Sequence, residues 1–153
     1  MSEINVKALL EKEQLDKEEK IYLFDELYWT NWQELDKSPS LVEKAFDYMR
    51  DDNLSIEEIS KILPLYNNPE GAHTDEFSEI TIDLYKKDRI KFLRALALNP
   101  DEAINLVYIF RLLKPFEDGD EELDSVREEG GLTPEEDEIA VTFFAMYKTI
   151  CNT

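Results

Sequence analysis

Signals that begin an α-helix recur along the whole chain, and each is followed by apolar residues at helical spacing. Two capping boxes are present, Asp16 with Glu19 and Ser55 with Glu58, in which the fourth residue can bond back to the first. Proline follows a capping residue at Ser38–Pro39, Asn99–Pro100 and Thr133–Pro134. Because no segment shows sustained alternation of apolar and polar residues, the pattern predicts an all-α fold without strands.

The spacing of the helix starts bears on how the helices are arranged. Starts at Ser38, Thr74, Asn99 and Thr133 are separated by 36, 25 and 34 residues. Helix-pair repeats have periods of roughly 34–47 residues, but the blocks of this chain share no residue signature. A length of 153 residues is typical of one domain. We therefore expect a single helical domain over residues 1–153, with about seven to eight helices in an irregular bundle or a short α–α superhelix.

Residues 117–138 differ in character from the rest of the chain. They contain 12 acidic side chains and one basic side chain, Arg127, and they include the pair Gly130–Gly131. Because closely spaced like charges resist compaction, this composition predicts a mobile acidic loop over residues 117–133, directly before the last helix.

The charge of the chain is strongly negative but unevenly distributed. The 36 Asp and Glu residues outnumber the 17 Lys and Arg residues, for a formal net charge of -19. Such a charge repels phosphate backbones and anionic membranes, so we expect no binding to nucleic acid or to a membrane. Residues 86–114 reverse the sign, with seven basic and three acidic side chains. Lys87, Lys91 and Arg94 share one helical face there, and we expect them to contact an anion or the acidic loop.

The cysteine content and the apolar runs bear on location. Cys151 is the single cysteine of the chain, which excludes an intramolecular disulfide and a thiolate metal site. The first residues contain no apolar run of the length found in signal peptides, and no stretch reaches the roughly 18–20 apolar residues of a membrane span. We therefore expect a cytoplasmic chain.

The acidic segment contains a pattern related to a calcium-binding loop. Counted from Asp118 as the first position of an EF-hand loop, Asp120, Glu122, Asp124 and Glu129 fall where calcium ligands are found. The chain has leucine where that loop needs glycine for its sharp turn, and serine where it has an apolar residue. The pattern indicates weak calcium binding rather than a dedicated site.

Residues suited to catalysis are scarce. The single histidine, His73, follows Glu70 with the Glu-x-x-His spacing that di-iron helical bundles use. Those sites need two such motifs on facing helices, and proline and glycine beside this one disfavour a helix. We nominate no catalytic residue and expect no cofactor.

The densest group of aromatic residues lies early in the chain. We expect one long helix from Asp16 to Leu35, in which Phe24 and Trp32 belong to the core stripe together with Tyr28. Tyr22 and Trp29 are seven residues apart and fall on a second stripe of that helix. Either a second layer of helices covers this second stripe, or Tyr22 and Trp29 anchor a partner, since exposed tryptophan and tyrosine are typical of binding hot spots.

Two interpretations of function follow from these patterns. The first is a non-enzymatic protein-binding module, in its sharper form an inhibitor or immunity-type protein that engages a basic surface of another protein through electrostatic attraction. In its simplest version, the negative charge serves solubility alone. The alternative is a carboxylate-only metal-binding protein or hydrolase, in which Asp and Glu would bind hard cations. The oligomeric state stays open.

Overall fold

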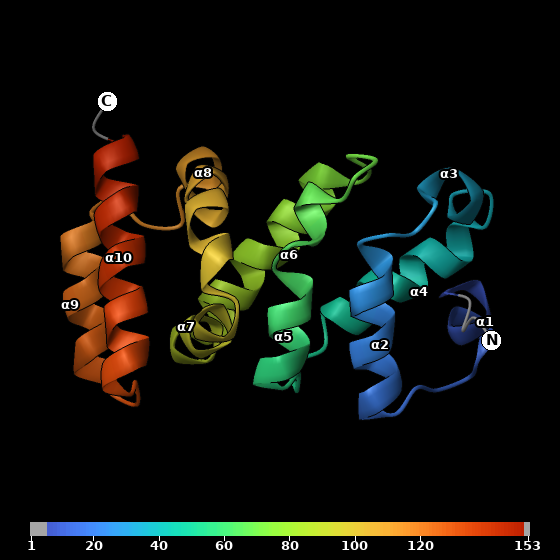
Figure 1. Ribbon diagram of the computed structural model, residues 1–153, viewed down its shortest axis with the longest axis horizontal. Coiled ribbons are helices and arrows are strands. Elements are labelled where there is room, and N and C mark those ends of the chain that lie inside the picture. Colours follow the sequence, from blue (N-terminus) through green and yellow to red (C-terminus); the bar gives the residue numbers. More distant parts are fainter. Residues whose placement is uncertain (1–5, 152–153) are drawn as a thin grey trace. The chain divides into compact units, whose positions relative to one another are not determined.

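A computed structural model of the chain describes residues 6–151 (Figure 1). Within this range the protein is all-α, as the sequence predicts, with ten α-helices, two short 3-10 helices and no strand. The chain divides into two compact units, residues 1–77 and residues 78–153. Helix α6 (Thr74–Lys87) begins in the first unit and continues into the second.

The helices of the first unit begin where the local capping signals are. They are α1 (Val6–Glu11), α2 (Lys17–Leu27), α3 (Trp32–Leu35), α4 (Pro39–Met49), α5 (Ile56–Ile62) and the 3-10 helix η1 (Leu65–Asn67). Both predicted capping boxes form: Asp16 accepts a hydrogen bond from the Glu19 amide at 2.8 Å, and Ser55 accepts one from the Glu58 amide at 3.1 Å. These bonds satisfy amides that the helix itself leaves unpaired.

The expected long helix from Asp16 to Leu35 is interrupted. Helix α2 ends at Leu27, and the side chain of Asn31 accepts a hydrogen bond from the Glu34 amide at 3.2 Å, which starts α3 as a separate helix. Asn31 is a strong capping residue, and capping competes with continuation of the preceding helix. The break rotates Trp32 out of the register that a single helix would impose.

Aromatic side chains form the core at one side of the first unit. The Trp32 ring lies 5.6 Å from the Phe77 ring, and the Phe46 ring lies 5.5 Å from it, both edge to face. All three side chains are buried. Edge-to-face pairs of this kind add to the free energy gained from burial alone, so these contacts stabilise the unit.

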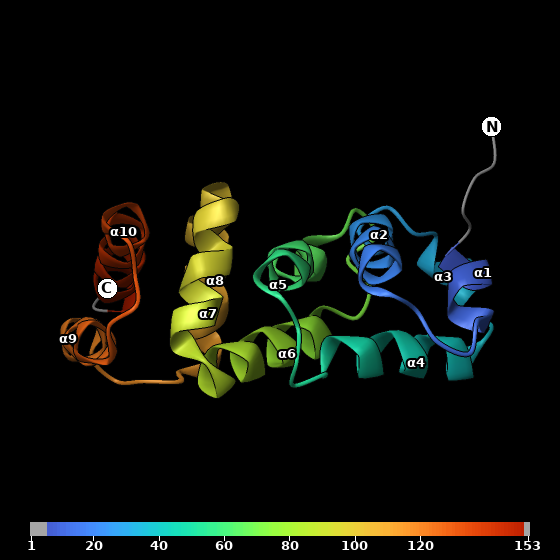
Figure 2. The ribbon, with the colours of Figure 1, turned by 90° about the horizontal axis from the view of Figure 1, so that it is seen from below.

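The second unit contains the rest of α6 and four further α-helices. These are α7 (Arg89–Leu98), α8 (Ala103–Leu113), α9 (Gly119–Glu129) and α10 (Pro134–Cys151), with the 3-10 helix η2 (Pro100–Glu102) between α7 and α8. Helices α9 and α10 lie side by side in both views (Figures 1 and 2). Phe110 of α8 packs against Phe143 of α10 with ring centres 4.9 Å apart, so α10 is covered by α8 as well as by α9.

The prediction of a mobile acidic loop over residues 117–133 is wrong for residues 119–129, which form α9. Asp118 caps this helix by accepting a hydrogen bond from the Asp120 amide at 2.8 Å, and acidic residues in the first turn interact favourably with the helix dipole. Val126 is buried, and the burial of its apolar side chain stabilises α9 in a way that the charge pattern does not indicate. The chain leaves the helix at Gly130 with a φ of 73°, a conformation that glycine adopts without strain.

A second feature that holds α9 in place is the close approach of Gly119 to α10. A Cβ atom at Gly119 would lie 2.8 Å from the carbonyl oxygen of Phe144, closer than two such atoms can pack. The absence of a side chain therefore lets the start of α9 rest on α10. The sequence pattern predicts neither α1 nor the separation of α3, so the ten helices of the described range exceed the seven to eight expected.

Candidate functional site

The side chain of Trp29 projects into solvent from the end of α2, with 71% of its surface exposed. Its ring touches Tyr28, with ring centres 4.8 Å apart at 80°. Tyr22, one of the two residues expected on a second stripe, is at the margin of exposure with 37%. No second layer of helices covers Trp29 in the described part of the chain. Of the two alternatives for this residue, the structure therefore leaves the one in which its side chain is exposed.

Acidic groups lie on the α2 face between Tyr22 and Trp29. Asp25 is mostly exposed and forms an ion pair with Lys61 at 3.4 Å. Glu26, one turn before Trp29, accepts hydrogen bonds on its backbone oxygen from the Trp29 amide and from the Thr30 hydroxyl, both at 3.0 Å. These bonds close the C-terminal turn of α2 and fix the direction in which the Trp29 side chain leaves it.

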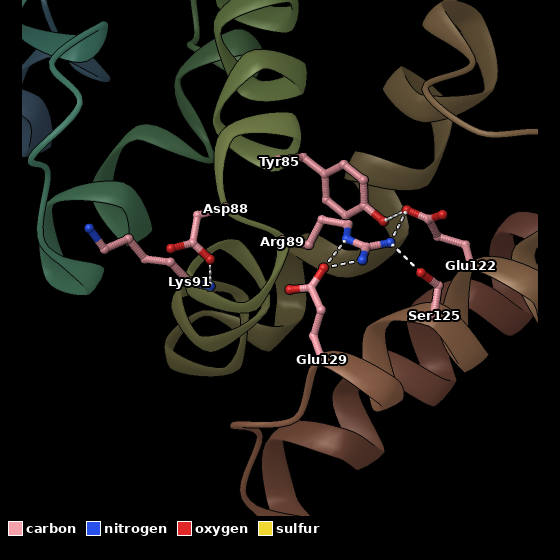
Figure 3. Close-up of polar contacts among 7 residues, drawn as sticks. All are labelled: Tyr85, Asp88, Arg89, Lys91, Glu122, Ser125 and Glu129. Atoms are coloured by element: carbon pink, nitrogen blue, oxygen red, sulfur yellow. Dashed lines mark hydrogen bonds and ion pairs between the residues drawn. The ribbon is translucent and has the colours of Figure 1, made fainter.

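The second unit joins the basic and acidic parts of the chain through Arg89 (Figure 3). Its guanidinium donates hydrogen bonds to the Ser125 hydroxyl at 3.1 Å and to the Glu129 carboxylate at 3.0 Å. It also lies 3.3 Å from the Glu122 carboxylate. Two carboxylates around one largely buried guanidinium raise the pKa of Arg89, chiefly through the hydrogen bond with Glu129.

Tyr85 completes this cluster from the last turns of α6. It is 2% exposed, and its hydroxyl donates a hydrogen bond to Glu122 (Figure 3). Burial raises the pKa of Tyr85 far above the ordinary value of 10.0, and the neighbouring Glu122 carboxylate raises it further. The phenol therefore stays protonated and serves as a permanent donor to that carboxylate.

The residues expected on the basic face, Lys87, Lys91 and Arg94, do not act together. Asp88 starts a new helix by accepting a hydrogen bond from the Lys91 amide at 3.0 Å, so residues 87 and 91 belong to different helices. The Lys91 side chain points away from the cluster around Arg89 (Figure 3). Arg94 forms an ion pair at 3.3 Å with Glu136 at the start of α10.

Arg89 is the residue that sequence reasoning missed. It lies in the same basic run, but the predicted face assumed one continuous helix across residues 86–94. The sequence also indicates a helix capped by Asp88, which the structure confirms, and a helix that begins there gives Arg89 a different direction from Lys87.

The outer face of α9 remains acidic. Glu121, Asp124 and Glu128 lie three and four residues apart on one stripe, and all three are exposed. Within the described residues their carboxylates make neither a hydrogen bond nor an ion pair. The nearby guanidinium of Arg127 is held by Asp137 at 2.8 Å instead. Carboxylates of α9 are thus paired on the inner side, whereas on the outer side they form no ion pair among the described residues, and Asp124 lies near a cation, Arg127.

The five carboxylates considered for calcium are not brought together. Asp118 caps α9 and Asp120 pairs with Lys148, whereas Glu122 and Glu129 both bind Arg89 and Asp124 faces solvent. Among the residues that the structure describes, no three His, Cys, Asp or Glu side chains are grouped closely enough to hold a metal ion. A helix spaces these residues around its axis, whereas an EF-hand loop folds them inward.

Glu70 and His73 likewise have separate roles in the first unit. The Glu70 carboxylate accepts a hydrogen bond from the Trp32 amide at 3.0 Å, at the start of α3. His73 Nε2 lies 2.7 Å from a carboxylate oxygen of Asp36, and the imidazole packs edge to face on Trp32 with ring centres 5.1 Å apart. Both side chains therefore hold the Trp32 region in place.

Comparison of the chain with protein-family models, with curated proteins and with solved structures found no match. None of the helices in residues 6–151 has the length and hydrophobicity needed to cross a bilayer. Two exposed features are the candidate sites: Trp29 in the first unit and the outer face of α9 in the second.

Proposed function

We propose that the chain is a non-enzymatic protein-binding module that engages a basic surface of another protein, as an inhibitor or immunity-type protein does. The observation that carries this proposal is the division of α9 into two faces. Its inner carboxylates are bound by the Arg89 guanidinium and the Tyr85 hydroxyl, whereas Glu121, Asp124 and Glu128 face solvent and form no ion pair among the described residues.

Uncompensated carboxylates on a rigid helix favour rapid capture of a cationic partner. A surface of one sign attracts the opposite sign over about one Debye length, roughly 8–10 Å at physiological salt. Such steering raises association rates by about 10–10³-fold. The same surface repels phosphate groups, so the proposed partner is a protein rather than nucleic acid or an anionic membrane. The expected cytoplasmic location is part of the same proposal.

Trp29 supports a binding role from the first unit. A large aromatic side chain that is 71% exposed costs free energy through its contact with water, and tryptophan is enriched among residues that dominate binding energy. In this proposal Trp29 and Tyr22 supply short-range affinity from the first unit.

The electrostatic part is tested with two charge-matched variants. The first carries Glu121→Gln, Asp124→Asn and Glu128→Gln; the control carries Glu11→Gln, Glu13→Gln and Glu43→Gln, which are exposed and change the net charge by the same amount. Immobilised protein captures basic proteins from a lysate at low salt, and a captured protein is then purified. We expect its association rate with the first variant to fall by about tenfold or more, and with the control to change little.

Two results would overturn this proposal. If no basic protein is captured at low salt, the surface attracts no partner. If both triple variants reduce capture equally, the total charge acts without a defined surface, which is the solubility interpretation. Trp29→Ala provides the complementary measurement: we expect the dissociation rate of the purified partner to rise while its association rate is unchanged.

A further inference from the structure

Helix α8 of the second unit carries apolar side chains on its solvent side. Ile104, Tyr108 and Leu112 are 44%, 51% and 82% exposed, and their spacing of four residues places them in one stripe. The opposite side of α8 is buried in the unit by Leu106 and Phe110 among others. A helix that is apolar on both sides exposes a surface that water disfavours, which is typical of an interaction site.

Charged side chains of opposite sign flank this stripe. Asp101 precedes the first turn of α8, whereas Arg111 and Lys114 lie at its C-terminal end. All three are exposed, and in the part of the chain that the structure describes none of their side chains forms an ion pair or a hydrogen bond. The stripe therefore has a negative end and a positive end, with Tyr108 midway between Ile104 and Leu112.

We propose that this stripe binds a second copy of the chain in an antiparallel arrangement with two-fold symmetry. A two-fold contact requires one surface that is complementary to itself. Antiparallel pairing around Tyr108 places Ile104 of each copy against Leu112 of the other. It also brings Asp101 of each copy to the end that carries Lys114 and Arg111.

The two alternatives, a parallel dimer and a separate acidic partner, are less favourable. Parallel packing of two α8 helices places Asp101 beside Asp101 and Arg111 beside Arg111, and like charges in contact repel. A separate acidic partner would match only the basic end of the stripe. The antiparallel dimer alone pairs both ends and covers all three apolar side chains.

The expected dimer is weak. One helical stripe covers less area than the roughly 1,200–2,000 Å² buried in stable complexes, so association depends on protein concentration. Analytical ultracentrifugation of the full chain, from about 10 µM to about 1 mM in about 0.2 M NaCl, spans the range in which such an interface forms. We expect the sedimentation coefficient to rise from that of a monomer toward that of a dimer.

Leu112→Glu tests whether the stripe is the interface. Each dimer contains Leu112 twice, so we expect the dissociation constant to rise by about tenfold or more. Thr142→Glu is the matched control, because Thr142 is exposed on α10 of the same unit and adds the same charge. A wild-type chain that stays monomeric throughout the range, or an equal effect of both variants, overturns the proposal. Circular dichroism checks that both variants keep their helix content.

The antiparallel direction is tested by exchanging the charges of the two ends. Asp101→Lys alone weakens association, and adding Arg111→Glu with Lys114→Glu restores it, because the pairs re-form with opposite sign. In a Cys151→Ser background, Tyr108→Cys forms an intermolecular disulfide readily. Leu112→Cys does so slowly, because the two copies of this position lie about 12 Å apart along the helix axes in the antiparallel pair. Failure of the charge exchange to restore association, or faster cross-linking at position 112, overturns the antiparallel dimer.

Discussion

The guanidinium of Arg89 lies 3.3 Å from the carboxylate of Glu122 and joins the basic part of the sequence to its acidic segment. Glu122 also accepts the hydrogen bond of the buried Tyr85 hydroxyl, so one carboxylate connects the end of α6 and the start of α7 to α9. This contact decides which acidic groups are used inside the second unit and which remain on its surface.

We predict that Arg89→Ala destabilises the second unit by about 1–3 kcal/mol. The change leaves Glu122, whose side chain is only 16% exposed, without its cation, and it removes one hydrogen bond to Ser125 and two to Glu129. Urea unfolding followed by far-UV circular dichroism measures the change, because both tryptophans lie in the first unit. Lys86→Ala, an exposed change one turn earlier, is the control and should have little effect.

Tyr85 should make stability depend on alkaline pH. Its pKa is raised on folding, so the unfolded chain ionises this phenol first, and the stabilisation present below pH 10 is lost progressively above it. One pH unit above 10 this loss is about 1.4 kcal/mol. The free energy of unfolding of wild type should therefore fall more steeply between pH 9 and 11 than that of Tyr85→Phe. Parallel curves for the two proteins would show that Tyr85 ionises freely in the folded state.

The two tryptophans should respond in opposite ways to substitution. Trp29 is exposed, so Trp29→Ala should change the free energy of unfolding by no more than about 0.5 kcal/mol. Trp32 is buried against Phe77, so Trp32→Ala should cost about 3–5 kcal/mol. Acrylamide should quench the fluorescence of a Trp32→Phe variant strongly and that of a Trp29→Phe variant weakly. A stability loss at position 29 similar to that at 32 contradicts the structure.

The first turns of α5 and α4 provide a matched test of how much a side-chain capping bond stabilises a helix. Ser55 accepts a hydrogen bond from the Glu58 amide, whereas Ser38 begins α4 without a side-chain capping bond. Ser55→Ala should therefore cost about 1 kcal/mol, and Ser38→Ala clearly less. Urea unfolding of the two variants measures the difference, and equal costs would mean that the bond at Ser55 contributes nothing.

Divalent cations should not stabilise the chain specifically. Because the carboxylates of residues 118–129 are distributed around α9 and among different partners, CaCl2 at about 5 mM should raise Tm no more than NaCl of equal ionic strength. Differential scanning calorimetry with both salts makes the comparison. A rise in Tm that saturates with calcium alone, and that is lost in Asp124→Asn, would show a bound ion.

Local signals explain what could be predicted from the sequence. The two predicted capping boxes at Asp16 and Ser55 form, and Pro39 occupies the first turn of α4 as expected. The predicted helix start at Thr133 forms a third box with Glu136. These interactions join residues within four positions of each other, so their geometry depends on the helix and hardly on the rest of the fold. The buried state of Phe24 also follows from the helical spacing of apolar side chains.

Prediction failed where distant residues set the outcome. The acidic segment forms α9 because Arg89 neutralises its inner carboxylates and the Tyr85 hydroxyl donates a hydrogen bond to one of them. These contacts join residues 33 to 40 positions apart in the chain, and Gly119 allows contact with α10. Local charge density alone predicted repulsion. The exposure of Trp29 beside the burial of Trp32 has the same origin, since the cap at Asn31 redirects the chain between them.

The sequence by itself determined the helical class, most of the helix starts and the uneven distribution of charge, because these depend on neighbouring residues and on composition. Only the tertiary structure decided which charges cancel inside the second unit and which face solvent. Coulomb attraction and hydrogen bonding act over a few ångströms, and only folding brings Arg89 within that distance of Glu122 and Glu129 while Glu121, Asp124 and Glu128 turn outward.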